Sequence, residues 1–177
     1  MAPGLDVIFC GINPGLESAA RGHNFARAGN RFWRALHGAG FTPRVLRPEE
    51  DGELPRYGIG MTNVVDRPSR GAADLSPEEL RAGAARVARL VAEYEPRVVA
   101  VVGLGAFRTG FERPKAALGI QPEPVGGRPV WVLPNPSGLN AHYQLPALVR
   151  LFGELRAWLR DGGRAPVPGA PRSPRTP

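Results

Sequence analysis

Residues 76–102 read SPEELRAGAARVARLVAEYEPRVVAVV, and this stretch decides the fold class. Ser76 is placed as an N-cap, a proline follows at the first helical position, and Glu79 completes a capping box, so a helix is predicted to begin here. Pro96 marks its end. The apolar run Val98–Val102 is typical of a central parallel strand that is covered on both faces. A helix followed by such a strand is the repeating unit of an α/β protein.

The rest of the chain continues this alternation. Strands are predicted at residues 6–10, 59–65, 98–102 and 130–133, and helices at residues 31–40, 77–95 and 145–159. Residues 42–57 are polar and contain proline, and we expect them to be mostly irregular. In the helix at 77–95, the solvated face is expected to carry Arg81, Arg86 and Arg89. This order predicts an α/β fold, a three-layer αβα sandwich with a mostly parallel central sheet, in which ligands bind beyond the carboxyl ends of the strands.

The length and composition fit one compact domain. With 177 residues, of which 42% are hydrophobic, residues 1–160 are predicted to form a single domain. Residues 161–177 consist mostly of Pro, Gly, Arg and Ser, which predicts a disordered basic tail. Nothing near Met1 resembles a signal peptide, and no segment approaches the roughly 18 apolar residues that span a bilayer. We therefore expect a cytoplasmic protein.

Charge and cysteine content narrow the function classes. The formal net charge is +7, and Lys115 is the only lysine. This excess suits a polyanionic partner, and the alternative explanation is a biased genome composition. Cys10 is the only cysteine, so the chain has no intrachain disulfide, no Cys-based zinc site and no four-thiolate iron–sulfur cluster. A reaction without metal or cofactor is the expectation.

Two short loops follow predicted strands and are candidates for function. Gly11-Ile-Asn-Pro-Gly15 fixes the backbone closely around Asn13, although taken alone it also fits an ordinary turn capped by this asparagine. The second loop, Pro134-Asn-Pro-Ser-Gly-Leu-Asn140, is also rigid but carries Leu139 near its tip. An exposed leucine in that position suits a wedge that enters a stack of bases.

These loops belong to a longer set of motifs. The set comprises GINPGL (11–16), GNRFW (29–33), YGIG (57–60), TNVVDRP (62–68), YEP (94–96) and NPSGL (135–139). In these motifs and their order, the chain resembles the mismatch-specific uracil-DNA glycosylase and thymine-DNA glycosylase family of the uracil-DNA glycosylase superfamily. The resemblance covers about residues 6–159. It implies the αβα sandwich of the uracil-DNA glycosylases, and an enzyme that flips a damaged base out of the duplex.

The resemblance implies that Asn13 holds the attacking water. An amide takes no proton at neutral pH, so Asn13 can position the water but cannot act as a general base. The reaction then depends on a uracil anion that hydrogen bonds stabilise, which predicts slow chemistry and a preference for better leaving groups, such as 5-fluorouracil or ethenocytosine. The fast enzymes of the superfamily carry aspartate in place of Asn13 and histidine in place of Asn135. Asp66 is a candidate compensating base, and the alternative is a structural partner of Arg67.

The resemblance also assigns the DNA contacts. The base pocket would be formed by Ile12, Gly15, Ser18, Phe25 and Asn135. Phe25 would stack on the flipped base, the alternative being an ordinary core phenylalanine. Ser18 would sense the C5 substituent of the base, so thymine should be a poor substrate. Leu139 would fill the gap in the duplex, and Gly138 and Asn140 would contact the widowed guanine. Arg67, whose guanidinium can bind a phosphate bidentately, and Ser137 are the candidate phosphate contacts. His142 is either a phosphate contact or a solvated surface histidine.

We therefore expect a monofunctional DNA glycosylase that excises uracil from G·U mismatches by hydrolysis of the N-glycosidic bond and leaves an abasic site for base excision repair. The expected partner is double-stranded DNA, bound by a monomer that is associated with the nucleoid when it acts. One alternative is a noncatalytic module of the same fold that binds damaged DNA. Another is a nucleotide phosphohydrolase, but its candidate acidic residues are explained by helix capping: Asp66, Asp74, Glu78 and Glu79.

Overall fold

A computed structural model describes residues 3–163 of the chain. Within this part, the strands form one sheet in the order β2-β1-β3-β5-β4. Their bounds are Val7–Gly11 (β1), Ile59–Asn63 (β2), Val98–Val102 (β3), Gly119–Ile120 (β4) and Val130–Leu133 (β5). All neighbours pair in parallel except β4, which pairs antiparallel with β5. The sheet is therefore mostly parallel, as the sequence predicted.

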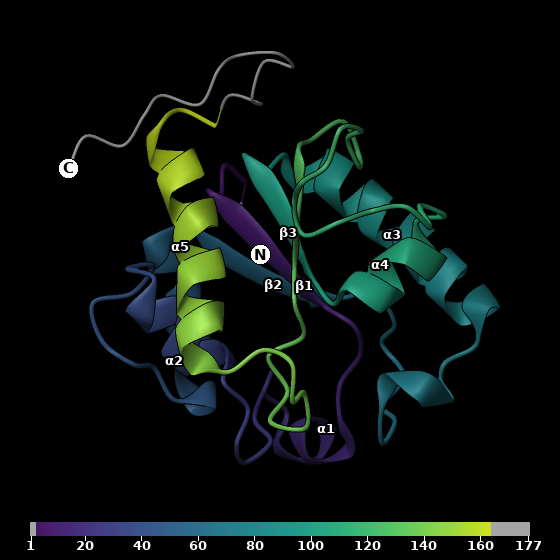
Figure 1. Cartoon of the computed structure of the whole chain (residues 1–177), viewed down its shortest axis with the longest axis horizontal. Helices are drawn as coiled ribbons and strands as arrows, with labels where there is room; N and C mark the ends of the chain where they lie inside the picture. The colour runs from purple at the N-terminus through teal and green to yellow at the C-terminus, as the bar shows by residue number, and fades with distance from the viewer. Residues whose placement is uncertain (1–2, 164–177) are drawn as a thin grey trace.

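Helices cover both faces of this sheet (Figure 1). The α-helices are Leu16–Arg21 (α1), Phe32–Gly38 (α2), Pro77–Tyr94 (α3), Leu104–Gly110 (α4) and Leu145–Arg160 (α5). Two 3-10 segments lie at Pro48–Tyr57 (η1) and Ala72–Asp74 (η2). Helices α2 and α5 pack on one face and α3 and α4 on the other. The chain thus forms the predicted α/β three-layer sandwich.

Strand β3 shows how the sequence builds these layers. Its residues are all buried, and successive side chains in a strand point to opposite faces. Val98, Ala100 and Val102 enter the core under α2 and α5, while Val99 and Val101 enter the core under α3 and α4. An unbroken apolar run is what a strand covered on both faces requires.

The order of the strands creates a switch point between β1 and β3. From β1 the chain passes through α1, α2 and η1 to β2 at one edge, and it then returns through α3 to β3 on the other side of β1. Ligands in open α/β sheets bind at such a point, beyond the carboxyl ends of the strands. The segment after β1 and the loop before α5 both lie at this end of the sheet, at the bottom of Figure 1.

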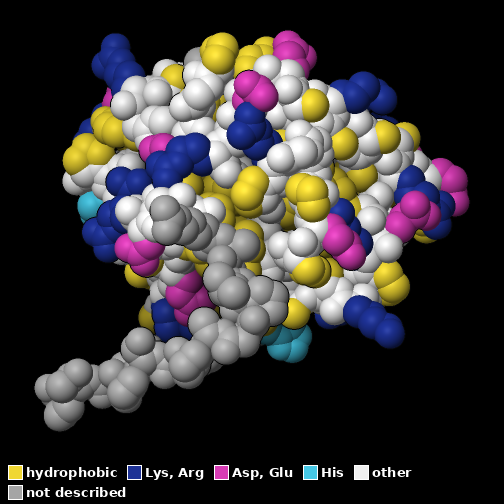
Figure 2. Space-filling model, turned by 90° about the horizontal axis from the view of Figure 1, so that it is seen from above, with side chains coloured by type: hydrophobic (Ala, Val, Ile, Leu, Met, Phe, Trp, Pro, Cys, Tyr) yellow, Lys and Arg dark blue, Asp and Glu magenta, His cyan; other side chains and the backbone are white. Residues whose placement is uncertain are grey.

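The opposite end of the sheet carries mixed charge. Figure 2 looks down onto this end and shows Lys and Arg side chains interspersed with Asp and Glu. Ion pairs at this end of the sheet include Arg97 with Asp6 and Arg128 with Glu95. Part of the basic charge on this face is therefore neutralised.

Several sequence predictions need correction. Residues 42–57 are not mostly irregular, because η1 occupies 48–57, where Pro48 opens the segment and the Glu50 carboxylate accepts a hydrogen bond from the backbone N–H of Arg47. Helix α1 and strand β4 were not predicted; both are too short to show a period. Arg86 is only partly solvated, since its side chain is 34% exposed and it donates to the carbonyl of Asn63 and to Asp66.

Two further predictions concern the C-terminal tail and the absence of a membrane-spanning segment. Of the predicted tail at 161–177, residues 164–177 lie outside the described residues. None of the helices within residues 3–163 is long and apolar enough to cross a membrane.

Candidate active site

A small cavity of about 120 Å³ lies at the carboxyl ends of β1, β2 and β5. This volume is below the roughly 300 Å³ of sites for drug-sized ligands and suits a single small ring. Its lining brings together Ile12, Asn13, Gly15, Ser18, Asn24, Phe25, Asn30, Asn63, Ser69, Asn135 and Ser137, with Arg27 and Arg70 as the charged members. Neither a carboxylate nor a histidine is among the residues that line it. Amides and hydroxyls therefore supply most of its polar groups, and Phe25, Ile12 and Val102 are among its apolar ones.

Gly11 makes room for two of these side chains. A Cβ at this position would lie 2.5 Å from Oδ1 of Asn63 and 3.2 Å from the ring of Phe25. Only glycine permits both to lie over the end of β1. The glycine that begins the first motif is thus required by the walls of the cavity.

Phe25 is held in the cavity wall from two sides. Its ring stacks on Phe32, with centroids 4.1 Å apart and an interplanar angle of 14°. Its backbone has φ 52°, a conformation that few non-glycine residues adopt. The buried hydroxyl of Ser18 accepts a hydrogen bond from the backbone N–H of Ala26, the next residue. Ser18 therefore supports the turn that presents Phe25.

Asn13 has a fixed amide orientation. Its Nδ2 donates to Oγ of Ser69 at 2.8 Å and to the carbonyl oxygens of Pro14 and Arg67, both at 3.2 Å. The Ser69 hydroxyl in turn donates to the carbonyl of Gly71 at 2.7 Å. These acceptors select the nitrogen, and no donor within the described residues reaches Oδ1. Oδ1 is left to accept a hydrogen bond from water.

Asn135 has the opposite orientation. Its Oδ1 accepts a hydrogen bond from the backbone N–H of Ser137 at 3.0 Å. Because a backbone N–H can only donate, the oxygen of the amide is committed, and Nδ2 has no acceptor within residues 3–163. Asn135 can therefore donate to a ligand in the cavity, whereas Asn13 can accept from one.

The loop of residues 134–144, here the β5–α5 loop, presents the predicted leucine. Leu139 is 72% exposed, more than any other large apolar side chain within residues 3–163. Asn140 braces the loop, since its Nδ2 donates to the carbonyl of Asn135 and its Oδ1 accepts from the backbone N–H of His142. Ser137 accepts the backbone N–H of Leu139 through Oγ at 3.3 Å. Leu139 is thus exposed on a loop that is stabilised by hydrogen bonds between its own residues.

Asp66 and Arg67 are not partners, which corrects the sequence interpretation. Asp66 is exposed, pairs with Arg86 at 2.9 Å, and does not line the cavity. Arg67 binds both carboxylate oxygens of Glu79, at 2.7 and 3.1 Å. This pair, together with the backbone N–H of Ser76, lowers the pKa of Glu79 to about 2, and the pair raises the pKa of Arg67. The Arg67 guanidinium is already committed to a carboxylate.

Sequence reasoning missed several residues at the cavity. Arg27 and Arg70 are exposed at its lining and form no ion pair with any described residue. Asn24 and Asn63 share a hydrogen bond of 3.2 Å, and Ser69 holds Asn13. Asn63 was detectable as a polar residue inside the strand predicted at 59–65 and within the TNVVDRP motif. Arg27 and Arg70 could not be distinguished in this way, because the chain contains many other arginines.

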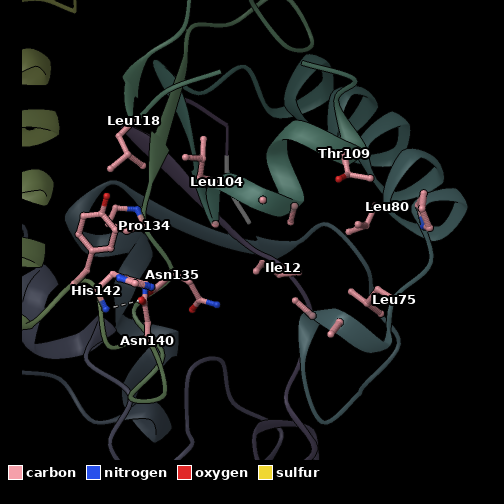
Figure 3. Close-up of a pocket in the computed structure, with 17 residues that line it drawn as sticks. Ile12, Leu75, Leu80, Leu104, Thr109, Leu118, Pro134, Asn135, Asn140 and His142 are labelled. Atoms are coloured by element: carbon pink, nitrogen blue, oxygen red, sulfur yellow. Dashed lines mark hydrogen bonds between the residues drawn. The ribbon is translucent and has the colours of Figure 1, made fainter. Parts of the chain in front are cut away.

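A larger, mostly apolar cavity of about 580 Å³ lies on the other side of Ile12 and Asn135, which line both cavities. Figure 3 shows Leu80 and Leu104 facing it from α3 and α4, with Asn135 and Asn140 on the opposite side. Ile12 and Asn135 therefore form part of the partition between the two cavities.

Two other reactive residues lie apart from the small cavity. Burial raises the pKa of the Cys10 thiol to about 12, so it is no nucleophile near neutral pH. Lys115 does not line the cavity. Within residues 3–163, no three His, Cys, Asp or Glu side chains are grouped so that they could hold a metal ion.

The model of the family described as the uracil DNA glycosylase superfamily matches residues 1–160. The match includes the whole sheet and both loops that line the small cavity.

Proposed function

The chain belongs to the uracil DNA glycosylase superfamily, and from this premise we propose that it is a mismatch-specific member that removes uracil and related pyrimidines opposite guanine. The superfamily supports a DNA partner, hydrolysis of the N-glycosidic bond and a role in DNA repair. The finer assignment rests on the motifs and on the two oppositely oriented amides.

The orientation of Asn13 and Asn135 carries the proposal. Oδ1 of Asn13 accepts a hydrogen bond from a water molecule and thereby directs the oxygen of that water toward C1′ of the deoxyribose. Nδ2 of Asn135 donates to a carbonyl oxygen of the base as negative charge develops there. The bond between C1′ and N1 breaks with its electron pair on N1, the water oxygen bonds to C1′, and the water proton passes to solvent. The products are an abasic site and a free base.

The absence of a carboxylate from the lining of the cavity predicts slow turnover. An amide orients water but accepts no proton, so the barrier depends on the stability of the departing anion. Bases with electron-withdrawing substituents, such as 5-fluorouracil, should leave faster than uracil. Asp66 is the remaining candidate for a general base, but its ion pair with Arg86 holds it outside the cavity lining.

The same geometry suits base flipping. Phe25 offers one face of an aromatic ring, and its other face is supported by Phe32. Leu139 is exposed on a braced loop and can fill the space left in the duplex. We propose that a cytoplasmic monomer carries out this reaction on double-stranded DNA.

Arg27 and Arg70 are the proposed phosphate contacts. Both lie at the cavity without an ion-pair partner among the described residues, whereas a phosphate would have to displace Glu79 from Arg67. This choice replaces Arg67 as the principal contact and keeps Ser137 as a secondary one.

The proposal is tested by single-turnover release of base from matched duplexes that contain G·U, A·U, G·T or G·5-fluorouracil. We expect the order 5-fluorouracil, then uracil opposite guanine, then uracil opposite adenine, with thymine slowest. Abasic sites are detected by alkaline strand cleavage. Binding to G·U without any abasic product would favour the noncatalytic module, and equal rates for G·U and A·U would contradict mismatch specificity.

A further inference from the structure

Arg31 is a buried cation that the proposed chemistry does not use. The residue is 6% exposed, and its side chain ends in a guanidinium cation. Burial of a charge is unfavourable unless hydrogen bonds compensate it. Every oxygen that accepts from this guanidinium within residues 3–163 is neutral.

All four acceptors belong to the β5–α5 loop. Nη2 donates to the carbonyl oxygens of Ser137 at 2.7 Å and Asn140 at 2.9 Å. Nη1 donates to the carbonyl of Tyr143 at 2.6 Å and to Oε1 of Gln144 at 3.1 Å. The two ends of the loop are thus tied to one planar group on each side of Leu139.

Backbone contacts also join the residues around Arg31 to the β5–α5 loop. The N–H of Arg31 donates to the carbonyl of Pro136 at 3.0 Å. A Cβ on Gly138 would lie 2.7 Å from the carbonyl oxygen of Gly29, so the two backbones approach as closely as glycine allows. Residues 29–31 therefore form the platform on which the loop rests.

This platform is also part of the small cavity. Asn30 lines the cavity, and Phe32, the next residue after Arg31, stacks under Phe25. We infer that Arg31 is a positioning residue that locks Leu139 in a fixed place relative to the base cavity. The consequence for DNA rests on the proposed function, whereas the contacts within the free protein do not.

Lysine cannot replace this arginine. The guanidinium has two terminal nitrogens with two hydrogens each, and it uses them on four acceptors. A lysine ammonium keeps the charge but has a single nitrogen. Arg31→Lys therefore removes the two-nitrogen geometry of the guanidinium but keeps the positive charge, whereas Arg31→Met removes both. Arg31→Lys also provides a test if Arg31→Met does not fold.

The first test is amide hydrogen exchange in the free protein. In Arg31→Met and Arg31→Lys, we expect faster exchange of the amides in residues 137–144 and no change in α3. The matched control is Arg97→Met, because Arg97 also donates to a backbone carbonyl, that of Leu159, and to Asp6 at the far end of the sheet. Unchanged exchange in the loop of both Arg31 variants would overturn the inference.

The second test is a double-mutant cycle on G·U duplex with Leu139→Ala, measured as single-turnover rates. Arg31→Lys should lower the rate by about tenfold to a hundredfold, because a misplaced wedge acts like a missing one. In that background, Leu139→Ala should cost little more. Losses that multiply would contradict the inference. If the unaltered protein releases no base at all, the proposed function fails, and hydrogen exchange still decides whether Arg31 holds the loop.

Discussion

Asn13 and Asn135 are the same side chain, yet the structure gives them opposite chemistry. Nδ2 of Asn13 donates hydrogen bonds to carbonyl and hydroxyl oxygens, whereas Oδ1 of Asn135 accepts a hydrogen bond from a backbone N–H. Residue types and motifs identified both positions from the sequence. The orientation of each amide depends on neighbours that are 1 to 56 residues away along the chain, so only the folded structure shows it.

Asn135→Asp tests the donor at this scale. Aspartate keeps the oxygen that accepts the Ser137 N–H but replaces the donor with a negative oxygen beside the departing anion. Removal of one such donor costs about a hundredfold to a thousandfold in rate. We expect a loss of this order for uracil in single-turnover assays, and a smaller loss for 5-fluorouracil, whose anion needs less help. An equal loss for both bases would show that Asn135 does not act on the leaving group.

The arginines mark the limit of sequence reasoning about single residues. Arg67 was expected to contact a phosphate because a guanidinium can bind one bidentately, but this guanidinium is bound to Glu79. Arg27, Arg31 and Arg70 were assigned no role from the sequence, which contains 23 Lys and Arg residues. Which arginine is paired, buried or unpaired depends on tertiary contacts.

At the scale of elements, strong local signals were reliable. The capping box predicted at Ser76 is formed, with both of its hydrogen bonds, and α3 ends at Tyr94, two residues before Pro96. The apolar run Val98–Val102 forms strand β3, as predicted. The segments α1, η1 and β4 escaped prediction because they are short or 3-10 in character, and tertiary contacts rather than a residue pattern define them.

The capping box predicts an acid dependence of stability. The pKa of Glu79 falls from 4.5 to about 2, first because of Arg67 and then because of the Ser76 N–H. A group with a depressed pKa in the folded state stabilises the protein above its unfolded pKa, and this contribution is lost as the pH falls from about 4.5 toward 2. Glu79→Gln should therefore lower the Tm at pH 7 and flatten the fall of Tm below pH 4.5.

The control for this experiment is Glu93→Gln, an exposed position on the same helix. Part of the acid dependence should survive in Glu79→Gln, because Arg44 and the Arg47 N–H also lower the pKa of Glu50 to about 2. A Tm profile of Glu79→Gln that matches the unaltered protein at every pH would contradict the account.

At the scale of the whole molecule, the site lies where the topology predicts it. Alternation of strands and helices was enough to expect a mostly parallel sheet and a site beyond its carboxyl ends. The strand order, and hence the meeting of the loops after β1, β2 and β5, was not readable from the sequence. It depends on long-range pairing that no local pattern encodes.

The whole-molecule account predicts how DNA binding depends on salt. Each phosphate contact adds about 0.9 to the slope of log K against log salt. Arg27→Gln and Arg70→Gln should each weaken binding to G·U and G·C duplexes alike and reduce this slope by about 1. Arg160→Gln, at the far end of α5, is the matched control. Fluorescence anisotropy over a salt series measures the slopes, and slopes equal to that of the control would rule out both contacts.

The central claim is that Asn13 positions the water and that no carboxylate acts as the base. The most direct measurement is single-turnover release of uracil from a G·U duplex by Asn13→Ala and by Asp66→Asn, at saturating enzyme. The account predicts that Asn13→Ala loses about a hundredfold or more of the rate, while Asp66→Asn stays close to the unaltered protein. A full rate in Asn13→Ala, with the loss in Asp66→Asn instead, would contradict it.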